Sequence, residues 1–111
     1  MAHAFTYGSL MWADIMGRVC GRAFSALPAS LADHARHPVQ GQDYPGMRPQ
    51  AGASVQGRLY LDLDEAALAR LDAFEGEEYQ RSEVRVQLPD GRSLLAWTYL
   101  YKPEFSARLG A

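Results

Sequence analysis

Hydrophobic and polar residues alternate with a period of two along most of the second half of the chain. Three runs with this period, 55–62, 79–88 and 93–102, each predict a β-strand. The turn Pro89-Asp90-Gly91-Arg92 joins the last two runs. Both faces of the last run are apolar or aromatic, which is typical of a central strand or of a barrel wall.

A helical period separates the first two of these runs. Asp64 is the expected N-cap of a helix from Glu65 to about Phe74, and Gly76 is expected to end it. The predicted apolar face of this helix consists of Ala67, Leu68, Leu71 and Phe74.

The first half of the chain is less regular. Residues 4–10 predict a short strand that stops at Gly8-Ser9, with Ser9 capping a short helix that frays towards Gly21. Residues 22–37 predict one or two short strands around Pro28. Residues 38–54 hold six glycines and prolines, so we expect a long loop there, and long loops in small domains are often functional.

These elements, five to seven strands and two short helices, predict a small α+β domain on a curled or barrel-like antiparallel sheet. The length of 111 residues suits one domain over 1–111, and 48% hydrophobic residues suit a globular core. Long helices do not alternate with the strands, which disfavours a doubly wound nucleotide-binding fold.

Charge and cysteine content narrow the expected partners. The net charge is −2, from 11 basic and 13 acidic residues without a basic block, so we expect no nucleic-acid partner. Cys20 is the only cysteine, and His34 and His37 lack a convincing third ligand, so we expect no metal ion and no cofactor. No run approaches the roughly 18 apolar residues of a membrane span, and a cytoplasmic location is the simplest expectation.

Two segments are candidates for chemistry. In Tyr7-Gly8-Ser9-Leu10 a strand runs into a helix, and unpaired backbone N–H groups at such a turn bind carboxylate or phosphate; the alternative is an ordinary turn. The second candidate places three glutamates at the end of a helix, where the dipole disfavours negative charge, a mismatch that points to a needed carboxylate. The alternative is a solvated acidic turn paired with Arg81. The three glutamates are Glu75, Glu77 and Glu78.

Taken together, four segments resemble the gamma-glutamylcyclotransferase-like family, which includes the gamma-glutamylamine cyclotransferases and the plant avirulence-induced proteins. Their order and spacing cover nearly the whole chain. The segments are 5–10, 44–49 with 55–60, 71–76 leading into 79–81, and 96–101.

The resemblance implies a small mixed, mainly antiparallel β-barrel flanked by short helices. It also implies release of a γ-glutamyl group as 5-oxoproline from a small γ-glutamyl amine or peptide. The family's glycine loop corresponds to residues 7–10, and its catalytic glutamate corresponds to Glu75, with Glu78 as a rival. A general base for an α-ammonium group needs a raised pKa, so we expect Glu75 to be partly desolvated against Phe74, Tyr99 or Tyr101.

The expected substrate-binding residues are Tyr7, Gly8, Ser9, Leu10, Tyr44, Tyr99 and Tyr101. We further expect the 41–54 segment to cover the pocket, with Tyr44 or Arg48 touching the ligand. Two other functions stay open: a non-catalytic module that binds an amino-acid-like ligand or a partner, and a transferase or deprotecting enzyme that acts on a carrier-bound γ-glutamyl group. The oligomeric state is also open.

Overall fold

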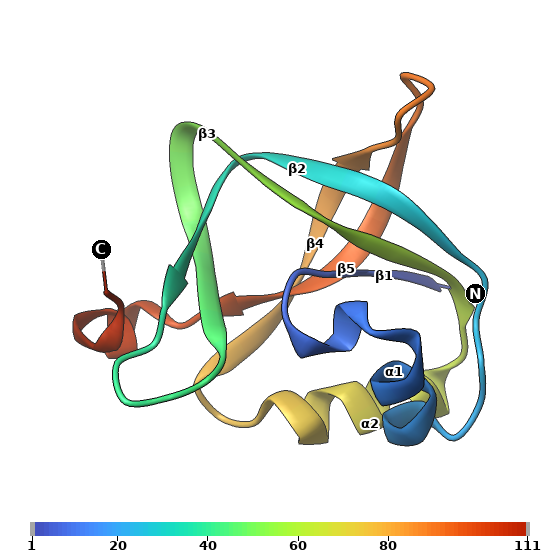
Figure 1. Cartoon of the computed structure of the whole chain (residues 1–111), viewed down its shortest axis with the longest axis horizontal. Helices are drawn as coiled ribbons and strands as arrows, with labels where there is room; N and C mark the ends of the chain where they lie inside the picture. The colour runs from blue at the N-terminus through green and yellow to red at the C-terminus, as the bar shows by residue number, and fades with distance from the viewer. Residues whose placement is uncertain (1, 111) are drawn as a thin grey trace.

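The computed structural model describes residues 2–110, which form a closed barrel of five strands in the order β1-β3-β2-β4-β5 (Figure 1). Strands β1 and β5 are parallel, and the other neighbouring pairs are antiparallel. The predicted mixed, mainly antiparallel barrel is therefore confirmed. The strands are β1 Ala2–Thr6, β2 Ala26–Pro38, β3 Pro45–Leu63, β4 Tyr79–Gln87 and β5 Ser93–Tyr101.

The largest difference from expectation is the long hairpin of β2 and β3. Its paired residues run from Ala26 opposite Tyr60 to Pro38 opposite Pro45, so the prediction of a loop over 38–54 is wrong, and only 39–44 connect the strands. The one or two short strands expected over 22–37 are a single long strand, β2. Residues 45–54 pair with β2 alone, whereas β1 pairs with β3 only from residue 58 onwards. Proline and glycine are tolerated there because the other edge of the strand has no ladder to complete.

A bulge bends this hairpin part-way along its length. The register shifts between Ala32 and His34, where Asp33 adopts a φ of 59°. The Asp33 carboxylate accepts a hydrogen bond from the backbone N–H of Gly52 across the hairpin at 3.1 Å. Bulges of this kind redirect a strand, and here the bend carries the β2–β3 connection past the end of β1 (Figure 1).

The helices agree with the sequence pattern better in the second half than in the first. The Asp64 side chain accepts from Ala67 N–H at 2.8 Å and caps α2, and Gly76 with a φ of 83° ends it, as predicted. Ser9 was expected as a cap and is not one, because it begins a 3₁₀ turn and makes no capping side-chain bond. The helical segments are η1 Ser9–Met11, α1 Ala13–Cys20, α2 Glu65–Glu75 and η2 Pro103–Arg108.

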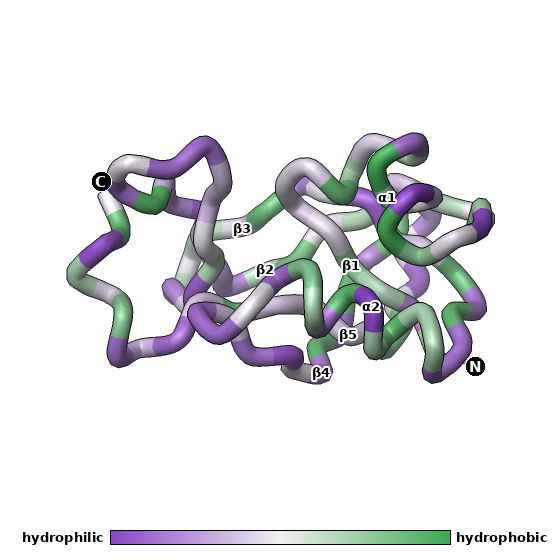
Figure 2. The backbone as a smooth tube through the Cα atoms, turned by 90° about the horizontal axis from the view of Figure 1, so that it is seen from below, coloured by the Kyte–Doolittle hydropathy of each residue, from purple (hydrophilic) through white to green (hydrophobic). Residues whose placement is uncertain are grey.

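The strands bury residues on both faces, as their period of two requires. Phe5, Leu59 and Val86 belong to a cluster inside the barrel, while Ala4 and Tyr60 belong to a second cluster shared with the helices. Helices α1 and α2 contact each other, and they lie in front of the strands when the molecule is seen from below (Figure 2). Short hydrophobic and hydrophilic stretches alternate along the strands in that view.

Gly57 shows how tightly β1 and β3 approach each other. A Cβ atom at this position would lie 2.2 Å from the Thr6 carbonyl oxygen and 2.7 Å from the Phe5 ring. Only glycine fits such an approach. Within residues 2–110, no helix has the length and apolar character needed to cross a membrane.

Candidate active site

A cavity of about 330 Å³ opens where four parts of the fold meet. The turn after β1, the C-terminal end of α2 and the β2–β3 connection lie on the same side of the molecule (Figure 1), and β4 and β5 supply the remaining wall. Its size is at the lower end of the usual range for ligand sites, which suits a small molecule. The lining residues are Phe5, Thr6, Tyr7, Gly8, Ser9, Leu10, Tyr44, Pro45, Phe74, Glu75, Tyr79 and Tyr99.

The turn at 8–10 supplies unpaired backbone donors to this cavity. Among the residues described, the N–H groups of Gly8, Ser9 and Leu10 make no backbone or side-chain hydrogen bond, whereas the Gly8 carbonyl accepts from Met11 N–H at 3.0 Å. The Tyr7 carbonyl accepts from Arg36 Nη1 at 2.7 Å, which fixes the start of the turn. Three consecutive backbone donors without a partner beside a cavity are suited to an anionic group, and binding there stays a prediction.

Glu75 is the last residue of α2, and it lines the same cavity. Its side chain is half-buried, and burial raises the pKa of this carboxyl from 4.5 to about 7. Across residues 2–110, the Glu75 carboxylate accepts no hydrogen bond and has no cationic side chain within 4 Å. The C-terminal end of the helix dipole acts in the same direction as burial, because it disfavours negative charge. Glu75 can therefore both accept and return a proton near neutral pH.

Glu78 has a different environment. Its Oε1 accepts a hydrogen bond from the Tyr101 hydroxyl at 2.7 Å, and its Oε2 forms an ion pair with Arg108. Neither Glu78 nor Tyr101 lines the cavity. Burial, followed by the bonded Glu78 carboxylate, raises the pKa of Tyr101 to about 12, so the hydroxyl remains a donor at neutral pH.

Buried tyrosines hold the cavity walls in place. The Tyr79 hydroxyl donates to the Pro45 carbonyl at 2.6 Å, which ties the start of β4 to the start of β3. The Tyr7 hydroxyl donates to the Tyr99 carbonyl and ties the turn to β5. Burial raises the pKa of all three tyrosines, and the Glu75 carboxylate adds to that rise, so each hydroxyl stays protonated.

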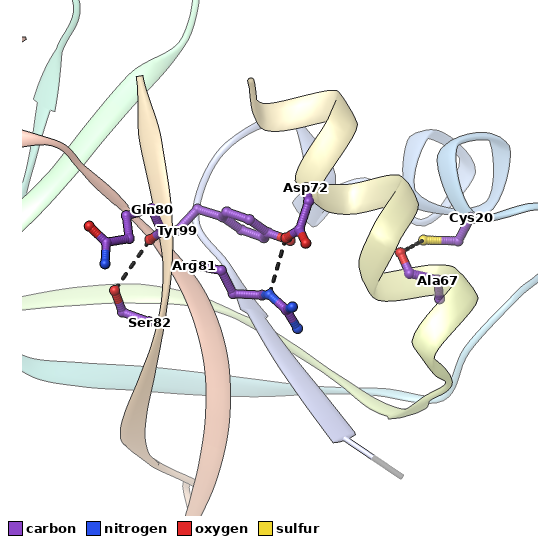
Figure 3. A network of polar contacts seen from close by, with 7 residues as sticks. All are labelled: Cys20, Ala67, Asp72, Gln80, Arg81, Ser82 and Tyr99. Atoms are coloured by element: carbon purple, nitrogen blue, oxygen red, sulfur yellow. Dashed lines mark hydrogen bonds and ion pairs between the residues drawn. The ribbon is translucent and has the colours of Figure 1, made fainter. Parts of the chain in front are cut away.

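Asp72, one turn before Glu75, anchors α2 to the barrel. The Tyr99 hydroxyl donates to Asp72 Oδ1 at 2.6 Å, and Arg81 Nε lies 3.1 Å from the same oxygen (Figure 3). Arg81 therefore pairs with Asp72 and not with one of the three glutamates. This network fixes the end of the helix that presents Glu75 to the cavity.

The fold brings together most residues that the sequence singled out. Tyr7, Gly8, Ser9, Leu10, Tyr44, Tyr99 and Glu75 line one cavity. Tyr101 and Arg48 lie outside its lining, and of the predicted loop only Tyr44 and Pro45 contribute. Phe74 was expected on the apolar face of α2, but its side chain is exposed and forms part of the cavity mouth.

Sequence reasoning did not assign Phe5, Thr6, Pro45 or Tyr79 to the site. Thr6 and Phe5 carry no separate chemical signal because they are ordinary residues of β1. Tyr79 stands in a segment already singled out, directly after the acidic turn, and its position at the start of a strand was the available clue. Within residues 2–110, no three His, Cys, Asp or Glu side chains cluster as a metal site would require.

Nearly the whole chain matches a known protein family. The family described as "Gamma-glutamyl cyclotransferase, AIG2-like" matches residues 4–110. AIG2-like protein D of Arabidopsis thaliana is 33% identical over 103 residues, which cover 91% of this chain and 68% of that protein. The Arabidopsis relatives are longer, and the chain spans between 50% and 68% of their lengths.

Two solved structures resemble the fold closely. The solution structure of At5g39720.1 from Arabidopsis thaliana has a TM-score of 0.82 and 27% identity, covering 94% of this chain and 73% of that one. A structure described as a gamma-glutamyl cyclotransferase has a TM-score of 0.77 and covers 91% of this chain and 66% of that one. Its identity of 22% makes it a likeness of fold.

Proposed function

The chain belongs to the gamma-glutamyl cyclotransferase, AIG2-like family, and from that membership we propose that it converts a small γ-glutamyl amine or peptide into 5-oxoproline and a free amine. The observation that carries the proposal is the pairing, in one small cavity, of an uncompensated carboxyl group with a turn of free backbone donors. Family membership supports the proposed reaction class, and the cavity has groups suited to that reaction.

The reaction forms one bond and breaks one. The α-nitrogen of the glutamyl group attacks its own γ-carbonyl carbon and closes a five-membered lactam, and the bond from that carbon to the leaving nitrogen breaks. The α-ammonium loses two protons in the process, and the departing amine, once protonated in water, gains two. No net proton or electron is consumed.

Glu75 is the proposed proton carrier. As the carboxylate, it removes a proton from the α-ammonium, whose pKa is about 8 in a free amino terminus. As the carboxylic acid, it returns a proton to the departing nitrogen. Its pKa of about 7 supports both roles, because a group that titrates near the working pH can give and take a proton with little penalty.

The turn at 8–10 is the proposed binding site for the oxygen atoms of the glutamyl group. Backbone N–H groups held in place by a neighbouring fold stabilise negative charge without reorganising. Orientation contributes as well, since the two reacting atoms belong to one molecule and need only be folded together. The tyrosine hydroxyls are committed to backbone and carboxylate acceptors, so their proposed role is to shape the wall.

The direct test is release of 5-oxoproline from γ-glutamyl amines and dipeptides by the purified protein. The proposal requires release by the wild type and a large loss in Glu75→Gln. A wild type that binds these compounds without turning them over would instead support a ligand-binding module.

A further inference from the structure

A second cavity, of about 800 Å³, adjoins the first. The two share four lining residues and so lie side by side, separated by a constriction formed by Gly8 and Ser9 of the turn, Tyr44 of the β2–β3 connection and Pro45 at the start of β3. The smaller chamber suits a glutamyl group, and the larger chamber is the adjoining space into which the rest of a substrate can extend.

The two chambers differ in charge. Among the described residues, Glu75 is the only charged one that lines the first cavity, whereas Arg36, Arg58 and Asp43 line the second and give it a net charge of +1. Among the residues described, no carboxylate lies within 4 Å of the Arg36 or Arg58 guanidinium. Other arginines of the chain do have such partners, namely Arg18, Arg81, Arg92 and Arg108.

The two arginines are not equivalent. Arg36 already donates to the Tyr7 carbonyl and so supports the turn. Arg58 lies beside the buried Tyr60 hydroxyl, which itself donates to the Leu10 carbonyl at 2.7 Å. A guanidinium has five N–H donors in a planar fork that fits a carboxylate, and those of Arg58 have no acidic partner in the described chain.

Apolar surface accompanies this charge. The Trp12 side chain is 67% exposed and the Tyr44 side chain 38% exposed, and both line the second cavity. Exposed aromatic side chains beside guanidinium groups that have no carboxylate partner among the described residues favour a particular kind of ligand. Such a ligand carries an anionic group next to an apolar one. In contrast, no cationic side chain among the described residues lines the first cavity.

We propose that the second cavity is the leaving-group subsite and that Arg58 selects substrates whose departing amine carries a carboxylate. The inference rests on the proposed function for its reaction, and it adds where the other half of the substrate lies and which residue recognises it. Arg58 is a specificity-determining residue here, because it contacts the leaving group and takes no part in proton transfer.

The test compares two substrates that differ only in this charge. The leaving group of γ-glutamyl-alanine carries a carboxylate where that of γ-glutamyl-isopropylamide carries a methyl group. We expect Arg58→Gln to lower kcat/KM for γ-glutamyl-alanine by about tenfold and to leave the isopropylamide within about twofold, since one charge-assisted contact is lost. Arg58→Lys should retain part of the preference, and added salt should weaken the preference in the wild type.

Arg48→Gln is the matched control, because Arg48 is an exposed arginine of the same hairpin that lines neither cavity. An equal fall for both substrates in Arg58→Gln, or no change for either, overturns the subsite. If the wild type turns over neither compound, the proposed reaction fails, and calorimetric binding of the same two compounds then decides the subsite. Tighter binding of γ-glutamyl-alanine that Arg58→Gln abolishes supports it, and equal binding overturns it.

Discussion

The Tyr101 hydroxyl donates a 2.7 Å hydrogen bond to Glu78, a carboxylate that also pairs with Arg108. Both Glu78 oxygens are thus used to join the start of β4, the end of β5 and η2. Three residues earlier, Glu75 lines the cavity without a partner among residues 2–110. Two glutamates that are close in sequence therefore have opposite environments, one suited to structure and the other to proton transfer.

Glu78→Gln is expected to lower stability and to leave the chemistry of the folded protein intact. Losing a charge-assisted hydrogen bond and a half-exposed ion pair should reduce the free energy of unfolding by about 1–2 kcal/mol. Urea denaturation measures this loss, and Glu77→Gln is the control because Glu77 is exposed. Loss of turnover in Glu78→Gln with unchanged stability would instead make Glu78 the proton carrier.

The pH dependence of kcat/KM should report the raised pKa of Glu75. In the free enzyme the carboxylate is the active form, so kcat/KM should rise with pH and level off above a pKa of about 7. Titration of the substrate α-ammonium near pH 8 adds a second change at higher pH. Rates measured between pH 4 and pH 9 test this, and an acid limb centred near 4.5 would show that Glu75 is fully hydrated or not the base.

Stability should respond to Glu75 in the opposite direction to activity. The folded pKa of about 7 lies above the ordinary 4.5, so the folded state holds its proton more tightly than the unfolded state. The resulting stabilisation is present in full below pH 4.5 and is lost as pH rises towards 7. Glu75→Gln should therefore have a higher Tm than wild type at pH 8. At pH 4.5 the difference in Tm between the two proteins should be smaller. A variant less stable than wild type at pH 8 would contradict this.

A side chain at position 8 would crowd Pro45 at the constriction between the two cavities. A Cβ atom there would lie 3.3 Å from Pro45 Cδ, tighter than an ordinary contact, although the φ of −126° suits any residue. Gly8→Ala should therefore lower kcat/KM by about tenfold or more, since small misplacements of reacting groups are expensive in rate, while Tm changes little. Gly17→Ala is the control, because its Cβ would make only an ordinary contact at 3.8 Å. Normal kcat/KM in Gly8→Ala would remove the turn from the site.

The sequence predicted correctly the elements that depend on interactions between residues close together in the chain. The strands β4 and β5 followed from their period of two, and α2 followed from Asp64 and Gly76 at its ends. The prediction of a loop failed for residues 45–54. Their glycines and prolines are typical of a loop, but in the fold they lie on the free edge of a bent hairpin. The edge is free because β1 pairs only with the other end of β3. That pairing joins distant parts of the chain, so no local pattern predicts it.

The residues of the candidate site likewise fall into those that a local sequence pattern predicts and those that it does not. The turn at 7–10 and Glu75 each carry a local signature, and both line the cavity. Tyr99 and Tyr101 share one face of β5 and look alike in sequence, yet only Tyr99 lies at the cavity, because Tyr101 is two residues further along and meets Glu78 instead. Pro45 and Tyr79 reach the site through the bend of the hairpin and their mutual hydrogen bond, which no local pattern encodes.

The proposed function depends above all on Glu75, which is proposed to carry the proton in a cyclisation that releases 5-oxoproline. The most direct measurement is 5-oxoproline formed from a panel of γ-glutamyl amines and dipeptides by wild type, Glu75→Gln and Glu77→Gln, against a blank without protein. We expect release by wild type and Glu77→Gln and a loss of about 100-fold or more in a folded Glu75→Gln. Full turnover in Glu75→Gln, or none in wild type across the panel, would contradict it.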